Sequence, residues 1–445
     1  MPAAPSLLIV PYRSKTGKLY SQIPTSGAGD FTVTRNTEAR RFNSAGLIES
    51  VASGIPRLDY YTSGGTAGCP ALLVEPAATN LCLQSTDTTT SWTLGANLTS
   101  GAIDVIGVSG INLTVAVSGS SIGDTPGANR MATINATLTS GSTYTISFLI
   151  KKTGAHTIGG FFANTSGATA TAFGSGFDVS GSFSSGSLIA TSPITNRIRR
   201  VERFGSDVFR CSETFTMTAT NVLTVLRLGP TVSVTGLNNS AVGTTMGFAA
   251  PQLELGSVPT SFIPTTAGTG SRSADVISVT GAVSGSIGQT AGTIYCEFAF
   301  LGTPTTRSGP IFLRQADSRG MSINFASTDS PSGIRFSSRN NAGTTSLNIV
   351  SGALQVGTFY KVAIAYDAAG TAAGGTQASG VVAYVNGSQV AIGTFQVPDA
   401  AGLTQFRMYG ANSGSDTEAF NGRIRAAALY TTRLTDAELA TLTTP

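Results

Sequence analysis

The stretch VVAYVNGSQVAIG, residues 381–393, contains two runs of strand-forming residues joined by the dipeptide Asn386-Gly387. A two-residue type I′ turn requires positive φ at both central positions, which Asn and Gly adopt most readily. The flanking runs contain valine and isoleucine, which favour β-strands. The stretch therefore predicts a β-hairpin, and it indicates that the surrounding chain is built from antiparallel strands.

Working outward, short runs with apolar residues at every second position recur elsewhere in the chain. Their apolar members are Tyr144, Ile146, Phe148 and Ile150; Phe209, Cys211, Phe215 and Met217; and Ile294, Cys296, Phe298 and Phe300. A period of two places such side chains on one face of a strand. Glycine-bearing turns separate the runs at intervals of about 8–12 residues, which is typical of sandwiches and jelly rolls. We predict an all-β fold with two β-sandwich (jelly-roll) domains.

One short helix is expected near the C-terminus. Thr435 and Glu438 have the spacing of a capping box, in which each side chain satisfies the backbone N–H of the other residue. Leu439 and Leu442 follow as the apolar residues that such a helix would bury.

The chain divides into four segments by composition. Residues 1–80 carry proline at positions 2, 5, 11, 24, 56, 70 and 76, which interrupts helices and strand ladders. We expect them to form an extended N-terminal anchoring and assembly segment. Regular β-patterns predict one sandwich at 81–265, with Leu81-Cys82-Leu83 as its first strand, and a second at 291–445. A Gly- and Ser-bearing linker at 266–290 separates them.

The composition excludes several classes of protein. Charged residues make up 11% of the 445 residues, whereas about 25% is usual. The net charge of +4 is too small to predict nucleic-acid binding, and 41% hydrophobic residues argue against a disordered chain. No apolar run approaches the ~18–20 residues needed to cross a bilayer. The start, MPAAPSLLIVPYRSK, lacks the features of a secretory signal.

Residues suited to catalysis or metal binding are scarce. His156 is the only histidine, and the cysteines at 69, 82, 211 and 296 form no Cys-x-x-Cys pair. We therefore expect free thiols, no cofactor and no metal site. Asp416 and Glu418 could share a strand face as glycosidase carboxylates, and Asp317 and Asp416 are alternative calcium ligands. A solvated loop is the favoured interpretation, so we predict that the chain is not an enzyme. The alternative is a polysaccharide-degrading enzyme, a depolymerase.

Five residues are candidate contacts for a glycan or a second subunit. Arg197, Arg199, Arg200 and Arg203 form the only dense basic run, which could meet an anionic polysaccharide or a neighbouring subunit. The favoured interpretation is an exposed strand whose arginine stems cover apolar surface. Trp92, the only tryptophan, is expected in the core or at a sandwich end, with sugar stacking as the alternative.

Nine longer segments, taken in their order along the chain, resemble segments of a known protein family. They are GAGDFTVTRNTEARRFNSAGLIE (27–49), GIPRLDY (54–60), ALLVEPAATNLCLQS (71–85), YTISFLIKK (144–152), VFRCSETFT (208–216), PQLELGSVPTSFIPT (251–265), VVAYVNGSQV (381–390), FNGRIRAAALY (420–430) and RLTDAELATL (433–442). Together they resemble a bacteriophage virion appendage protein of the tail-fibre, head-fibre or decoration type. The middle segments resemble a carbohydrate-binding-module-like jelly roll, and the last three resemble a laminin-G/concanavalin-like domain.

This resemblance implies a structural component of a virion. Such a protein docks on other virion proteins, here through residues 1–80, and displays lectin-like β-sandwiches for adhesion to host-surface glycans. The resemblance also implies a homo-oligomer, most simply a trimer, on an extracellular particle that is assembled in the host cytoplasm. It supplies no catalytic residues. Many copies on one particle make weak sugar contacts effective through high local concentration.

Overall fold

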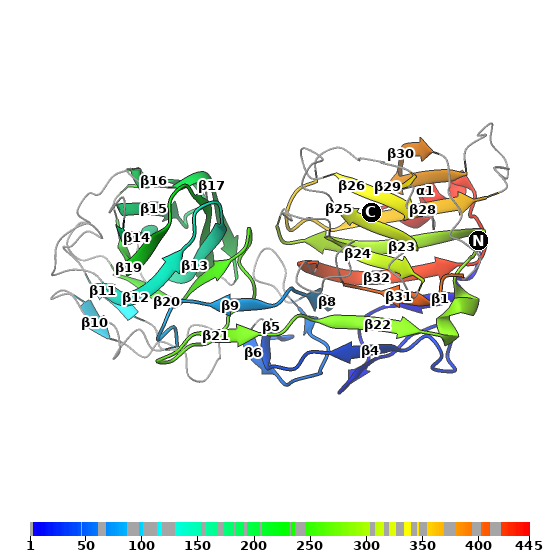
Figure 1. The fold of residues 1–445 in the computed structure, drawn as a ribbon, viewed down its shortest axis with the longest axis horizontal. Helices are drawn as coiled ribbons and strands as arrows, with labels where there is room; N and C mark the ends of the chain where they lie inside the picture. The colour runs from blue at the N-terminus through cyan, green and yellow to red at the C-terminus, as the bar shows by residue number, and fades with distance from the viewer. Residues whose placement is uncertain are drawn as a thin grey trace.

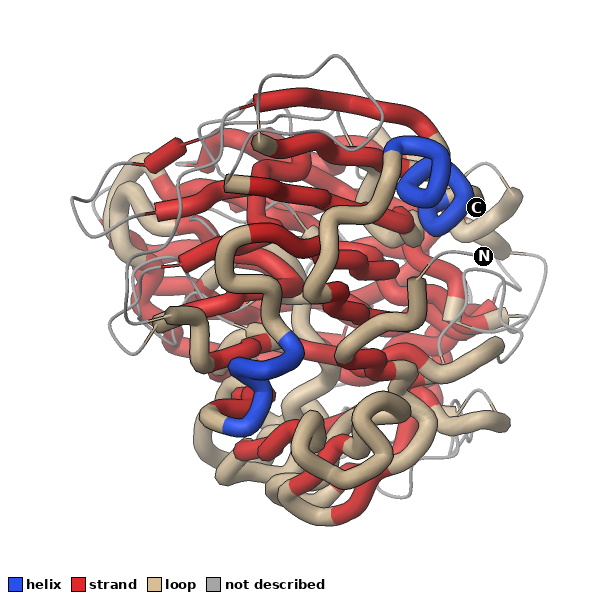
Figure 2. The backbone as a smooth tube through the Cα atoms, turned by 90° about the vertical axis from the view of Figure 1, so that its right-hand side faces the viewer, coloured by secondary structure: helices blue, strands red, loops and turns tan. Residues whose placement is uncertain are grey.

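The structure is a computed structural model. It describes residues 3–45, 47–60, 68–86, 98–100, 114–117, 130–152, 156–167, 172–181, 183–190, 194–204, 207–231, 233–235, 245–302, 308–315, 320–325, 333–339, 345–346, 354–368, 380–393, 402–409 and 420–445. These residues are almost entirely strand and loop (Figure 2), which confirms the all-β prediction. No helix within these ranges is long and apolar enough to span a membrane.

Two packed sheets form the first sandwich, at the left of Figure 1. In spatial order, the six-stranded sheet contains β10 (Leu98–Ser100), β11 (Thr114–Val117), β20 (Thr245–Leu255), β13 (Thr143–Lys152), β18 (Val208–Met217) and β17 (Ile194–Arg203). The five-stranded sheet contains β12 (Arg130–Leu138), β19 (Asn221–Pro230), β14 (Ile158–Gly167), β15 (Ala172–Asp178) and β16 (Ser185–Ala190). Phe148 meets Phe161 and Phe177 edge to face between them, at centroid distances of 6.2 and 5.8 Å. The apolar positions predicted for β13 and β18 all lie in this core.

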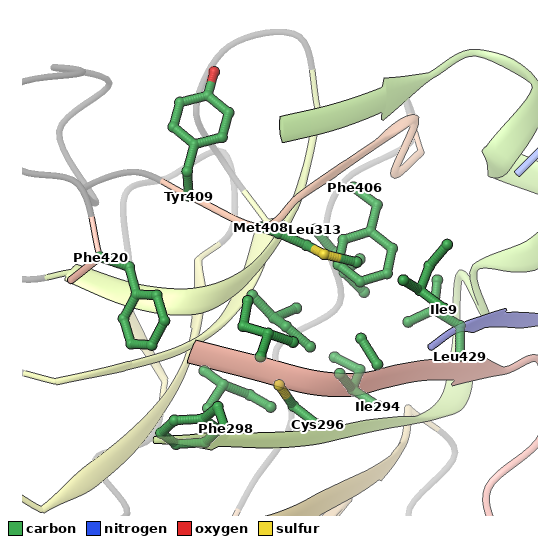
Figure 3. Close-up of a cluster of buried hydrophobic side chains, with 14 of the residues drawn as sticks. Ile9, Ile294, Cys296, Phe298, Leu313, Phe406, Met408, Tyr409, Phe420 and Leu429 are labelled. Carbon is green, nitrogen blue, oxygen red and sulfur yellow. The ribbon is translucent and has the colours of Figure 1, made fainter. Parts of the chain in front are cut away.

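Two larger sheets form the second sandwich. The eight-stranded sheet contains β30 (Ser388–Gly393), β29 (Val381–Val385), β28 (Tyr360–Asp367), β23 (Ala291–Phe300), β32 (Gly422–Tyr430), β8 (Ala71–Val74) and β7 (Leu58–Asp59), with β1 (Leu7–Ile9) also paired to β32. The nine-stranded sheet contains β2 (Ser14–Lys15), β3 (Lys18–Leu19), β4 (Phe31–Thr34), β22 (Val276–Thr280), β31 (Gln405–Arg407), β24 (Ser308–Arg314), β25 (Gly320–Phe325), β26 (Ile334–Arg339) and β27 (Thr345–Ser346). Figure 3 shows Ile294, Cys296 and Phe298 of β23 in the shared core, as the sequence predicted.

The predicted hairpin and helix are both present. Asn386 and Gly387 join β29 to β30 with φ values of 47° and 81°, as a type I′ turn requires. Helix α1 (Asp436–Thr443) begins at the predicted capping box, in which Glu438 N donates to Thr435 Oγ1 at 3.3 Å. Leu439 of α1 packs in an apolar cluster with Tyr295 of the eight-stranded sheet.

The described part of residues 3–80 is not an extended segment, contrary to the prediction for 1–80. Strands β1, β7 and β8 belong to the eight-stranded sheet, and β2, β3 and β4 lie at one end of the nine-stranded sheet. Of these strands, Figure 1 labels β1, β4 and β8. Leu7 pairs with Leu429 and Leu72 pairs with Ile424, and Ile9 lies in the core of the second sandwich (Figure 3). The prolines shorten these strands without preventing them, because each strand needs only two to four residues between interruptions.

Residues 266–290 are structured too, although the sequence predicted a linker. β21 (Gly270–Arg272) pairs with β9 (Ala78–Asn80), β22 joins the nine-stranded sheet, and the 3-10 helix η1 (Ala282–Ser286) follows. Strand β9 ends at Asn80. Leu81-Cys82-Leu83, which the sequence predicted to be the first strand of the first sandwich, does not form a strand. We call β9 and β21 the neck. Because its two strands are neighbours, the first sandwich is an insertion into the second.

Candidate functional site

The two sandwiches meet at a seam that contains a cavity. The hairpin of β5 (Ala39–Phe42) and β6 (Ile48–Val51) contributes to it, together with strands of both sandwiches. The cavity offers about 50 Å³ to water-sized molecules, and the space reaches about 590 Å³ with its open mouth included. One water needs roughly 10–15 Å³ on the first measure, so the enclosed space has room for a few water molecules. Its lining includes Arg40, Phe42, Asp59, Phe204, Arg210 and Arg423.

One wall of the seam cavity is aromatic. The rings of Phe42 and Phe204 meet edge to face, with centroids 4.8 Å apart and planes at 85°. The guanidinium group of Arg210 lies 5.0 Å from the centroid of Phe204, and Arg210 Nε donates to Glu202 Oε2 at 2.7 Å. These contacts hold an aromatic surface in place, and such a surface suits the apolar face of a sugar ring.

Another part of the lining is charged. Arg423 Nε donates to Asp59 Oδ2 at 2.6 Å, and the Phe42 N–H donates to Asp59 Oδ1 at 2.7 Å. Arg40 Nη1 lies 2.9 Å from Glu38 Oε1, whereas Arg40 Nε is buried without a hydrogen-bond acceptor among the described residues. A buried donor without an acceptor costs about 1–3 kcal/mol. An oxygen atom of a water or ligand in the cavity would therefore find a favourable partner here.

A buried ion network lies where the neck meets the second sandwich. We define it as Arg35, Arg57, Glu75, Arg272 and Asp275, whose side chains are at most 2% exposed. Arg57 Nη1 lies 2.6 Å from Glu75 Oε2, and Arg57 Nη2 contacts Asp275. Arg35 Nη1 lies 3.0 Å from Asp275 Oδ1, and Arg272 Nη2 lies 3.4 Å from Glu75 Oε2. The network thus fastens segments that are distant in sequence.

This network keeps Glu75, which also lines the seam cavity, ionised. Burial on its own raises the pKa of Glu75, but the charges of Arg57 and Arg272 and a hydrogen bond from Ser261 hold that pKa well below its usual range. Burial lowers the pKa of Arg57, but the charges of Asp275 and Glu75 outweigh burial and raise it. Glu75 is therefore a fixed, charged acceptor and not a general acid at neutral pH.

Arg197 and Arg199 do not form the exposed basic strand that the sequence suggested. Both lie on β17, where Arg199 Nε is 3.2 Å from Glu213 Oε2 and Arg197 Nε contacts Glu213 Oε1. Arg197 Nη2 donates to the Gly174 carbonyl at 2.9 Å, and Arg199 Nη2 donates to Ser187 Oγ at 2.8 Å. Because Gly174 and Ser187 belong to the opposite sheet, these arginines join the two sheets of the first sandwich.

The other two arginines of the run lie in different surroundings. Arg200 Nη1 donates to the Leu301 carbonyl at 3.0 Å, which links the first sandwich to the second. Burial lowers the pKa of Arg200. Arg203 is exposed. The run is therefore not one basic patch, and contact of its members with a glycan or second subunit stays a prediction.

Several candidate residues lie outside the described ranges. They are Trp92, Asp317, Asp416 and Glu418. Within those ranges, no group of three or more His, Cys, Asp and Glu side chains is placed to hold a metal ion. The four cysteines are free. The Cys82 thiol lies in the core of the first sandwich, and burial raises its pKa.

The sequence did not reveal the seam or the ion network, although it held a signal for the latter. Glu75 interrupts the apolar run ALLVEP, and Asp275 directly precedes the β-favouring run VISV. A charge inside an apolar run must be paired if the run is buried. The positions of its partners, by contrast, follow only from the tertiary structure.

Comparison with known sequences bears on the second sandwich. Residues 282–440 match the family model described as the Concanavalin A-like lectin/glucanases superfamily. The strands that residues 3–80 and β22 add to this sandwich lie outside the match. No curated protein matches the chain.

Solved structures similar to the chain include a carbohydrate-binding module and sialidases. The Ruminococcus gnavus IT-sialidase CBM40 is 16% identical, and the match covers 36% of this chain and 85% of that one at a TM-score of 0.27. The Trypanosoma rangeli sialidase with 2,3-difluorosialic acid is 11% identical, over 63% of this chain and 50% of that one, at a TM-score of 0.28. A leech intramolecular trans-sialidase is 20% identical, and the match covers 35% of this chain and 23% of that one at a TM-score of 0.26. At these TM-scores the likeness carries no argument about ligand or activity.

These findings bear on three expectations. The prediction that the chain is not an enzyme is withdrawn: the similar solved structures include sialidases, and we assign no activity from them. The laminin-G/concanavalin-like resemblance of the C-terminal part is confirmed, and the lectin-like β-sandwich fold is shown for residues 282–440. The matches give no indication of a bacteriophage origin.

Proposed function

We propose that the chain is a carbohydrate-binding structural protein that displays two lectin-like β-sandwiches as an appendage of a bacteriophage particle. The observation that carries carbohydrate binding is the lectin-superfamily match over residues 282–440. The appendage role is supported by the order of the nine sequence segments. Several copies, a trimer in the fibre analogy, raise the local concentration of weak sites.

The seam cavity is the proposed sugar contact. Phe204 offers an aromatic surface, Asp59 offers a carboxylate, and Arg40 Nε is a buried donor without an acceptor among the described residues. Polar groups placed around an aromatic wall are the usual composition of a small-molecule site. Since β1, β2, β3, β4, β7 and β8 belong to the sheets of the second sandwich, docking on a particle would use the surface of a folded domain.

A glycan microarray probed with the full chain tests carbohydrate binding. We expect Arg40→Gln to weaken retention on the bound glycans about tenfold, because it removes a charge-assisted hydrogen bond. Lys152→Gln removes one positive charge from β13 and serves as the control with unchanged retention. If the wild-type chain retains no glycan above an unrelated β-sandwich protein, carbohydrate binding is refuted.

The particle location needs a separate measurement. An antibody against the chain should label purified phage particles at regular positions in electron micrographs. Particles that remain unlabelled, while the antibody recognises the purified chain, would refute the appendage role and leave carbohydrate binding untouched.

A further inference from the structure

A row of polar side chains crosses five strands on the outer face of the nine-stranded sheet. Leu19, Phe31, Ile277 and Phe406 point into the core, so their strand neighbours point outward. The outward residues form a continuous cross-strand register: Lys15 pairs with Lys18, Lys18 with Thr32, Thr32 with Ser278, and Ser278 with Arg407. We call these five residues the polar track. Four steps between strands of about 4.8 Å make it roughly 19 Å long.

One end of the polar track carries a cluster of positive charge. The guanidinium group of Arg13 lies 5.7 Å from the centroid of the Tyr20 ring, and the ammonium groups of Lys15 and Lys18 each lie 5.9 Å from it. Lys18 Nζ also lies 3.3 Å from Asp30 Oδ2. Arg13 and Lys15 are exposed, and among the described residues neither forms an ion pair. We call Arg13, Lys15, Lys18 and Tyr20 the basic head.

The basic head concentrates positive charge, of which the Lys18–Asp30 ion pair neutralises only a part. Lys15 and Lys18 are directly opposite on an antiparallel pair, where like charges destabilise a sheet. Each of the three cationic groups lies within 5.9 Å of the same ring centroid, so their fields add at this point of the surface. A bound anion would relieve this repulsion, so the arrangement favours an anionic ligand.

The rest of the polar track limits the shape of that ligand. Thr32 and Ser278 present hydroxyl groups between the basic head and Arg407 at the other end. Because side chains alternate between the two faces of a strand, the core residues point away from this surface. Thr32 is exposed on it. A linear polymer that carries both hydroxyls and repeated carboxylates complements such a row. The few cations and the net charge of +4 fit a polyanion such as duplex DNA less well.

We propose that the basic head and polar track together bind a linear acidic polysaccharide, a polymer of uronic-acid type. This inference rests on the proposed carbohydrate binding, to which it adds a second site and a class of ligand. Every residue of the site except Arg407 lies outside the segment that matches the lectin superfamily. The site gives the N-terminal strands a binding role in addition to their part in the core.

Binding of the full chain to polygalacturonate, measured by biolayer interferometry at low and physiological salt, tests the proposal. The Arg13→Gln/Lys15→Gln variant should bind roughly 5- to 30-fold more weakly and with less salt dependence, because it loses two ionic contacts. Thr32→Val, which removes one hydroxyl from the track, should weaken binding about threefold without changing the salt dependence. The Lys151→Gln/Lys152→Gln variant removes the same charge from β13 and should bind like the wild type.

The possible results separate the two proposals. If the wild-type chain binds neutral glycans on the microarray but not polygalacturonate, the inference is overturned and the proposed function stands. Equal losses of polygalacturonate binding in the two double variants, or no loss of binding in Thr32→Val, would also refute the proposed site. Binding of duplex DNA as tight as that of polygalacturonate and equally sensitive to Arg13→Gln/Lys15→Gln would show a general polyanion surface instead.

Discussion

Replacing Asp275 by Asn should destabilise the second sandwich by about 3–5 kcal/mol. Asp275 accepts hydrogen bonds from Arg35 Nη1 and from the Glu75 N–H, both at 3.0 Å, and it contacts Arg57 Nη2. The substitution keeps the shape of the side chain but leaves three buried guanidinium groups with one carboxylate. Removing one partner of a buried ion pair typically costs about 3–5 kcal/mol, since the remaining charge is uncompensated.

Urea unfolding followed by far-ultraviolet circular dichroism measures this loss. With a slope of about 3 kcal/mol per molar urea, the midpoint should fall by roughly 1–1.7 M. Asp436→Asn is the matched control, since it removes a pair with Arg433 at 3.5 Å in which the aspartate is 42% exposed. The control should lose less than about 1 kcal/mol. Similar small losses in both variants would refute the argument that burial makes the network costly to break.

Three further predictions concern single residues. Phe148→Ala should cost about 3–5 kcal/mol in urea unfolding, because the ring is 1% exposed and its loss leaves a cavity; a cost below 1 kcal/mol would contradict the described core. Thr435→Ala should cost about 1 kcal/mol in thermal unfolding through loss of the helix cap, and Thr435→Ser should restore most of it. Since the folded pKa of Glu75 lies below its unfolded value near 4.3, its contribution is present at neutral pH and lost as the pH falls toward the folded pKa. The difference in unfolding free energy between wild type and Glu75→Gln should therefore be constant from pH 6 to 8 and narrow below about pH 4; a constant difference down to pH 3 would contradict this account.

Local features of the fold were predictable because local physics determines them. The alternation of Ile294, Cys296 and Phe298 specifies a strand with one buried face, and Asn386-Gly387 specifies a tight turn wherever the hairpin lies. Both signals act over a few residues. The short N-terminal strands have the same kind of signal, as in the buried–exposed alternation of β4, but that signal does not reveal that β4 pairs with the distant β22.

Long-range pairing and charge placement were not predictable in the same way. Nothing near Leu7 specifies Leu429 as its partner, because that pairing depends on a core assembled from distant strands. For Glu213, however, the sequence does contain a signal for its placement. It alternates with Cys211 and Phe215, so a period of two places its carboxylate inside the sandwich, where it needs a cation. That requirement points to the nearby arginines as internal partners.

The pairing of β1 with β32 has a consequence during synthesis. A ribosome that adds about 5–20 residues per second needs roughly 20–85 s to travel from Leu7 to Leu429, so β1 emerges long before its partner exists. The inserted sandwich is contiguous in sequence and can fold during that interval. Meanwhile the unpaired N-terminal strands of neighbouring nascent chains are open to pairing with each other. Slow translation or crowded polysomes should therefore favour aggregates joined through these strands.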